Sequence, residues 1–152
     1  MTDAVPHLKP ATDKDLNQLL PLVRAYHEFE NVSQTDADRA ATLRPLLLDE
    51  SLGRIWLVSV DDRLIGYIAL CFGYSIEFKG KDAFVDEFFI EPQWRGQGIG
   101  GLVLSAICEQ AAALGVKGLH LEVARNNHRA RALYAAHGFD SREQFHMMSR
   151  TL

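Results

Sequence analysis

Residues 85–100, VDEFFIEPQWRGQGIG, join an apolar run that holds two adjacent carboxylates to a glycine-rich loop. The run 83–90 (AFVDEFFI) has the β-branched and aromatic composition of a strand, and 98–114 has apolar residues at helical spacing. Glycines at such a junction let backbone N–H groups approach a ligand without interference from Cβ atoms. Because a helix start also carries partial positive charge, the stretch predicts a site for a phosphate or pyrophosphate group.

The same glycines suggest a second interpretation, which the order of elements excludes. Gly96, Gly98 and Gly101 match the G-x-G-x-x-G pattern of dinucleotide-binding folds, and Glu122 follows them. However, residues 91–95 separate the strand from the first glycine, whereas the dinucleotide turn follows its strand closely. The loop also lies too far along the chain to leave room for further βα repeats. A P-loop is excluded because no Gly-Lys-Ser/Thr follows.

Working outward from this stretch, the sequence predicts one domain over 1–152 with the order β-α-α-β-β-β-α-β-α-β. Parallel pairing is expected between 83–90 and 118–123, because a helix crosses over between them. The fold class is therefore mixed α/β (α+β), with helices on both faces of a mixed sheet. We expect strands at 5–9, 54–60, 64–72, 83–90, 118–123 and 145–151, and helices at 12–29, 36–48, 98–114 and 127–137.

Charge and composition narrow the function classes. The 16 basic and 20 acidic residues give a net charge of −4, which disfavours a nucleic-acid partner and suits a cationic or amine substrate. Cys71 and Cys108 lie in apolar stretches, so we expect packed thiols and no disulfide. No metal site is expected, since the cysteines lack ligand spacing and His27-Glu28 lacks the second histidine of H-E-x-x-H. Neither a signal peptide nor a membrane span is visible, so we expect a cytoplasmic protein.

Two blocks of sequence resemble the GNAT superfamily of N-acetyltransferases. Residues 95–100 (RGQGIG) fit its (Gln/Arg)-x-x-Gly-x-(Gly/Ala) loop, and residues 127–139 (NHRARALYAAHGF) resemble its N-x-x-A-x-x-x-Y-x-x-x-G-F helix. The two blocks in this order are more specific than either alone. The resemblance covers roughly residues 6–151, is strong over 83–139, and is closest to the polyamine and aminoglycoside acetyltransferase branches.

The resemblance implies a GNAT-like fold that binds acetyl-CoA between strands 83–90 and 118–123, which splay apart. The strand backbone would pair with the pantetheine arm, and a backbone N–H near Phe89 or Ile90 would stabilise the thioester oxygen. The loop N–H groups would hold the pyrophosphate, while Asn127 would tether the cofactor or the split strand. The implied cofactor-binding residues are Phe88, Phe89, Ile90, Arg95, Gly96, Gln97, Gly98, Ile99, Gly100, Asn127 and Ala130.

Acetyl transfer to an amine requires a base for the ammonium and benefits from an acid for the leaving thiolate. By its position in the family pattern, Tyr134 is the expected acid. Asp86, Glu87 and Glu122 are the candidate bases, of which Asp86 matches polyamine-type relatives and Glu122 matches ribosomal-protein-type relatives. Strand alternation sends Asp86 and Glu87 to opposite faces of the sheet. His120 and His146 are expected to be packed or surface residues.

These residues predict an enzyme that transfers an acetyl group from acetyl-CoA to a primary amine of a small cationic acceptor, by direct attack in a ternary complex. Residues 26–38 are expected to line the acceptor site. Two alternatives stay open: a protein-lysine or N-terminal acetyltransferase, and a non-catalytic acyl-CoA-binding regulatory module. A homodimer is expected from the family resemblance.

Overall fold

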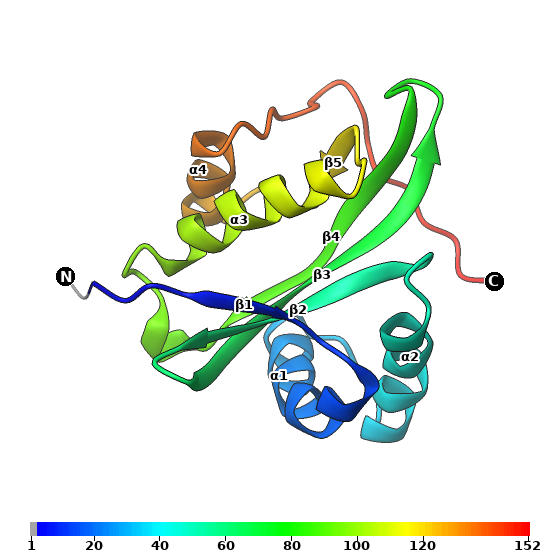
Figure 1. Cartoon of the computed structure of the whole chain (residues 1–152). Helices are drawn as coiled ribbons and strands as arrows, with labels where there is room; N and C mark the ends of the chain where they lie inside the picture. The colour runs from blue at the N-terminus through cyan, green and yellow to red at the C-terminus, as the bar shows by residue number, and fades with distance from the viewer. Residues whose placement is uncertain (1–2) are drawn as a thin grey trace. The chain divides into compact units, whose positions relative to one another are not determined.

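The computed structural model describes residues 3–152 and divides the chain into two compact units, the first ending at Glu122 and the second being Val123–Leu152. The first unit holds β1 (His7–Pro10), α1 (Leu16–Phe29), α2 (Asp36–Leu48), β2 (Gly53–Val60), β3 (Arg63–Ser75), β4 (Gly80–Ile90), α3 (Ile99–Ala113) and β5 (Gly118–His120). The second unit holds α4 (His128–Ala136). Short 3-10 turns precede α1 at Asp13–Asp15 and α3 at Pro92–Trp94. Figure 1 shows the elements along the chain.

The five strands form one mixed sheet in the order β1-β2-β3-β4-β5. The first four pair antiparallel, and β4 pairs parallel with β5 across α3, as the crossover predicted. The tight turn between β2 and β3 places Asp61 and Asp62 at φ angles of 49° and 62°. Aspartate tolerates this left-handed conformation, which two-residue hairpin turns require.

Helices cover both faces of this sheet, which confirms the predicted mixed α/β class. In Figure 1, α1 and α2 lie against one face and α3 lies against the other. Ile55 and Leu57 belong to the core under α1 and α2, whereas Trp56, 1% exposed between them, points to the opposite face. In the described residues, no helix is both long and apolar enough to cross a membrane.

Capping hydrogen bonds that involve threonine residues lie at the starts of the two helices on the α1–α2 face of the sheet. Before α1, the Thr12 backbone N–H donates to Asp15 Oδ2 at 2.8 Å. At α2, the Asp38 backbone N–H donates to Thr35 Oγ1 at 3.1 Å. Each pair satisfies N–H groups that a helix start leaves without helical partners.

A β-bulge in β4 overturns the expected alternation of the two carboxylates. Ala69 of β3 pairs with Glu87, but the next residue, Leu70, pairs with Val85. Asp86 is thus the extra residue of the bulge, and it interrupts the period of two that would have sent it to the face opposite Glu87.

The parallel pairing of β4 with β5 is short. Pairing runs from Asp82↔Gly118 to Phe84↔His120, while β4 continues to Ile90. The predicted strand over 118–123 therefore ends at His120, since residues 121–123 are not in a strand. The splaying of the two strands that the family resemblance implies stays a prediction.

The second unit corrects the end of the predicted element order. Within Val123–Leu152, residues 145–151 form no strand, and Phe145, Met147 and Met148 are exposed. A strand needs a hydrogen-bonded neighbour, which an apolar pattern alone does not supply. The helix predicted at 127–137 is confirmed as α4, and Gly138 follows it at a φ of 87°.

A close backbone approach between β3 and β4 yields a stability prediction. A Cβ atom added at Gly66 of β3 would lie 2.1 Å from the carbonyl oxygen of Phe89. We expect Gly66→Ala to lower the free energy of unfolding by about 1–3 kcal/mol, the usual cost of overpacking. Urea denaturation measures the change.

Gly73→Ala on the same strand is the matched control. There the nearest atom is Asp82 Oδ1 at 2.8 Å, the far end of a side chain that can rotate away. We expect this substitution to change stability by less than about 0.5 kcal/mol. Equal effects of the two substitutions would contradict the prediction.

Candidate functional site

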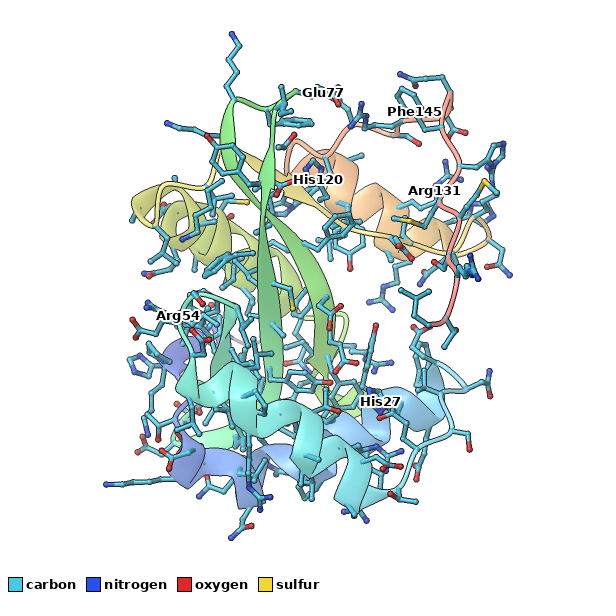
Figure 2. All side chains as sticks on the ribbon, turned by 90° about the vertical axis from the view of Figure 1, so that its right-hand side faces the viewer. His27, Arg54, Glu77, His120, Arg131 and Phe145 are labelled. Carbon is cyan, nitrogen blue, oxygen red and sulfur yellow. The ribbon has the colours of Figure 1, made fainter. Side chains whose placement is uncertain are left out.

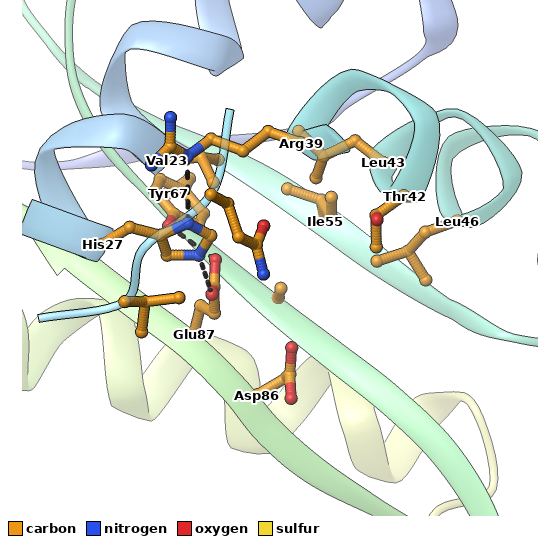
Figure 3. A pocket seen from close by; sticks show the side chains of 13 residues that line it. Val23, His27, Arg39, Thr42, Leu43, Leu46, Ile55, Tyr67, Asp86 and Glu87 are labelled. Carbon is orange, nitrogen blue, oxygen red and sulfur yellow. Dashed lines mark hydrogen bonds and ion pairs between the residues drawn. The ribbon is translucent and has the colours of Figure 1, made fainter. Parts of the chain in front are cut away.

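A pocket of about 230 Å³ lies in the first unit between the sheet and the helices α1 and α2. Its walls are largely apolar and include Val23, Leu43 and Ile55, while Asp86 and Glu87 bring two carboxylates to it. Figure 3 shows these side chains around the pocket. Val32 and Gln34 come from the segment 26–38, which was expected to line such a site.

Both carboxylates face this pocket because of the bulge in β4, but their surroundings differ. The Asp86 side chain is exposed, and no hydrogen bond or ion pair holds it within residues 3–152. Glu87 is only 20% exposed, and both of its oxygens accept hydrogen bonds. The pocket therefore contains one restrained carboxylate and one unrestrained carboxylate side by side.

Glu87 is held from two elements. The Tyr67 hydroxyl of β3 donates to Glu87 Oε1 at 2.8 Å, and His27 of α1 lies with Nε2 2.6 Å from Glu87 Oε2. Arg39 of α2 in turn donates from Nε to His27 Nδ1 at 3.1 Å and bonds to Asp36 Oδ1 at 2.8 Å. His27 and Arg39 are each only 6% exposed. The dashed lines in Figure 3 trace the His27 contacts.

The protonation of this network follows from its donors. A guanidinium group can only donate, so His27 Nδ1 must accept and carries no proton. The ring proton is then on Nε2, from which the neutral ring donates to Glu87. Burial, together with the Glu87 charge, raises the pKa of Tyr67 far above its ordinary value. Tyr67 therefore keeps its proton and is a permanent donor to Glu87.

The glycine loop has the geometry of an anion site. Gly96 and Gly98 adopt φ angles of 74° and 82°, and α3 starts after Gly98 without a side-chain cap. The first hydrogen bond of α3 runs from Leu102 N–H to Gly98 O at 3.3 Å, so the N–H groups of residues 99–101 precede it. A Cβ at Gly98 would meet nothing within 4 Å, which means that open space adjoins this helix start. The loop thus fits a phosphate-bearing ligand.

The Arg95 side chain makes contacts within the first unit. Its Nε donates to the Ile90 carbonyl at 2.7 Å. Its guanidinium carbon lies 5.4 Å from the Phe89 ring centroid and 5.3 Å from that of Phe29, at the end of α1. Arg95 therefore connects the loop to β4 and α1, and its expected contact with phosphate stays a prediction.

The other predicted site residues occupy separate places. Phe88, Phe89 and Ile90 pair with β3 through one edge of β4. Glu122 is exposed two residues beyond β5 and does not line the pocket. Gln97 Nε2 donates to the Gln93 carbonyl at 3.1 Å. Within residues 3–152, no group of three or more His, Cys, Asp or Glu side chains could hold a metal ion.

Three predicted residues belong to the second unit. Asn127 caps α4, where its Oδ1 accepts the Ala130 N–H at 3.2 Å. The Tyr134 ring packs edge-on against Phe139 with 5.9 Å between centroids. The roles of Asn127, Ala130 and Tyr134 toward a ligand stay predictions.

The partners of Glu87, among them His27 on α1 (Figure 2), were not predicted from the sequence, although a signal existed. His27 follows the buried Val23 by four residues on α1, and Arg39 precedes the buried Leu43 by four residues on α2. Both polar side chains therefore lie on the inward faces of their helices. A buried charge needs a partner, so Arg39 and Glu87 pointed to an internal network.

Comparisons with known proteins identify similar sequences and structures. The family model described as Acetyltransferase (GNAT) family matches residues 17–139. A thialysine N-epsilon-acetyltransferase of Bos taurus is 29% identical over 140 residues, covering 86% of this chain and 82% of that protein.

Solved structures share the fold. An integron cassette protein from the mobile metagenome of Cole Harbour Salt Marsh aligns with a TM-score of 0.84 and 28% identity, covering 95% of this chain and 90% of that one. A "predicted acetyltransferase" of Clostridium acetobutylicum, solved with acetyl-CoA, aligns with a TM-score of 0.77 and 18% identity, covering 95% and 96%.

Cys71 gives a prediction about the chemistry of the pocket region. Both cysteines are free, as expected, and burial with the Asp86 and Glu87 charges raises the pKa of the Cys71 thiol to about 11. Below that pH the thiol stays protonated, since a raised pKa disfavours the thiolate. In a Cys108→Ser background, we expect iodoacetamide alkylation of Cys71 to rise about tenfold per pH unit from pH 7 to 10, followed by mass spectrometry. A plateau below pH 9 would contradict this.

Proposed function

The chain belongs to the acetyltransferase (GNAT) family, and on this premise we propose that it transfers an acetyl group from acetyl-CoA to a primary amine of a small cationic acceptor. The observation that carries the proposal is the pair of carboxylates, Asp86 and Glu87, in one pocket of the first unit. The glycine loop at the start of α3 belongs to the same unit. Two comparisons support the proposal: a relative is named for an amine acceptor, and a protein of the same fold was solved with acetyl-CoA.

The pocket favours a positively charged acceptor. Apolar walls can take the aliphatic part of an amine, while the two carboxylates offset the charge of its ammonium group. The net charge of −4 favours the approach of a cation in the same way. An acceptor of this kind matches the acceptor class expected from the sequence.

Asp86 is the proposed base. An alkylammonium group with a pKa near 10 must lose a proton before it can attack a carbonyl carbon. The bulge turns the exposed Asp86 carboxylate toward the pocket, where no other described side chain occupies its oxygens. Tyr134 is the proposed acid, which would give its proton to the leaving sulfur. Acetyl-CoA, when bound, supplies the electrophilic thioester carbonyl.

The loop and β4 would hold the donor. The N–H groups from Arg95 to Gly100 suit its diphosphate, and the edge of β4 at Phe88–Ile90 suits backbone pairing with its pantetheine arm. A backbone N–H near Phe89 or Ile90 would stabilise the oxyanion. No metal takes part in the proposed reaction.

Direct transfer in a ternary complex is favoured over an acyl-cysteine intermediate. Cys71 lies near both carboxylates, but with a pKa of about 11 it has little nucleophilic thiolate at neutral pH. The cytoplasmic location and the homodimer stay predictions from the sequence. The alternatives are a protein-lysine or N-terminal acetyltransferase and a non-catalytic acyl-CoA-binding module.

An amine panel tests the function. We expect folded protein to bind acetyl-CoA in calorimetry and to release free CoA thiol with small cationic amines such as thialysine, faster than with lysine peptides or protein N-termini. Faster turnover of peptides would favour the protein-acceptor alternative. Acetyl-CoA uptake without thiol release on any amine would favour the non-catalytic module.

A matched pair of carboxamide variants tests the base. We expect Asp86→Asn to lower kcat about 10²- to 10⁴-fold, the usual contribution of a general base, with acetyl-CoA affinity kept. Glu122→Gln, which lies outside the pocket, should leave kcat within about twofold of wild type because surface substitutions have small effects. The reverse order of the two effects would assign the base to Glu122.

A further inference from the structure

The Glu87 carboxylate is the most constrained acidic group of the pocket. Its partners form a hydrogen-bonded network that begins in α2. Asp36 fixes Arg39, Arg39 donates to His27, and His27 donates to Glu87. Figure 3 shows that Arg39, His27 and Glu87 approach from three different elements, α2, α1 and β4. This network therefore links α1 and α2, on one side of the pocket, to β4 on the other.

Arg39 selects the tautomer of His27. A neutral imidazole can carry its proton on either nitrogen, and only the Nε2–H form donates to Glu87. The Arg39 Nε–H occupies Nδ1 at 3.1 Å, so the alternative tautomer would set two donors against each other. At 6% exposure, water can hardly replace Arg39 in this task.

The two donors to Glu87 fix how it faces the pocket. His27 takes one lone pair of Oε2 and Tyr67 takes one of Oε1, so the carboxylate plane cannot rotate without losing a charge-assisted hydrogen bond. Each oxygen keeps a second lone pair for a ligand. Such a group is well prepared to bind a cation, because its orientation is set before the ligand arrives.

We propose that His27 and Arg39 are positioning residues that hold Glu87 as the cation-binding carboxylate of the acceptor pocket, while the unrestrained Asp86 removes the proton. This division of roles rests on the proposed function. It separates two neighbouring carboxylates by their hydrogen bonds: Glu87 accepts two, whereas Asp86 accepts none from the described side chains.

Steady-state kinetics with thialysine as the probe amine test the proposal. We expect His27→Leu to raise the KM for the amine about 10- to 100-fold, the range for loss of a hydrogen bond to a charged group. The KM for acetyl-CoA should not change, and kcat should fall by less than the amine KM rises. His27→Gln should restore most of the affinity, because its amide N–H can donate to Glu87.

The Tyr67→Phe variant tests the positioning of Glu87 independently of His27. It removes the other donor to Glu87 but keeps the ring in the core, where Tyr67 is fully buried. We expect the same selective rise in amine KM, with melting temperatures recorded to show that each variant is folded. This variant keeps the proposal testable where His27→Leu does not fold.

A double-variant cycle isolates the role of Arg39. Arg39→Leu should raise the amine KM in the wild-type background but not in the His27→Gln background, since an amide has no tautomer to select. A purely structural role of Arg39 would produce the same loss in both backgrounds, which would overturn its assignment.

The remaining outcomes separate this proposal from the proposed function. Calorimetric binding of thialysine without CoA release would overturn only the function, and the dissociation constants of the variants would still measure positioning. An unchanged amine KM in folded His27→Leu or Tyr67→Phe would overturn the positioning role. So would wild-type protein that does not bind this amine.

Discussion

One extra residue in β4 determines most of what this site can do. Without the bulge, Asp86 and Glu87 would lie on opposite faces of the sheet, one toward α3 and one toward α1 and α2. With the bulge, both carboxylates reach one pocket, yet only Glu87 stays in the ladder beside Ala69, within reach of Tyr67 and His27. A single change of register thus brings two carboxylates with different hydrogen bonding to the same pocket.

The same strand also organises the other half of the site. The pairing of β4 with β5 ends at Phe84. Beyond its own end at Ile90, β4 leads through Pro92–Trp94 into the glycine loop. The opened edge of the strand and the start of α3 are therefore successive segments of one stretch of chain. This continuity explains why residues 85–100 carried so much of the prediction, since they hold the bulge, the last part of β4 and the glycine loop together.

Local patterns predicted the elements well, and long-range pairing was the limit. The helices predicted at 36–48 and 98–114 agree with α2 and α3, and the strands predicted at 54–60 and 64–72 agree with β2 and β3. The bulge could not be predicted, because it depends on how β3 fits β4. The strand at 145–151 was wrong because its apolar pattern found no neighbour. The candidate carboxylates were visible in sequence, whereas the contact between Glu87 and His27 depends on how α1 packs on the sheet.

Arg95 connects the glycine loop to α1 and β4, the two elements that carry His27 and Glu87. Its guanidinium lies against Phe29, two residues after His27 on α1, and against Phe89, two residues after Glu87 on β4. A ligand that draws Arg95 toward the loop would change the support of both segments. If a ligand at the loop changes the affinity of the pocket through these contacts, linkage requires a ligand in the pocket to change the affinity of the loop by the same factor. Such a coupling would make the two ligands help or hinder each other without fixing the order in which they bind.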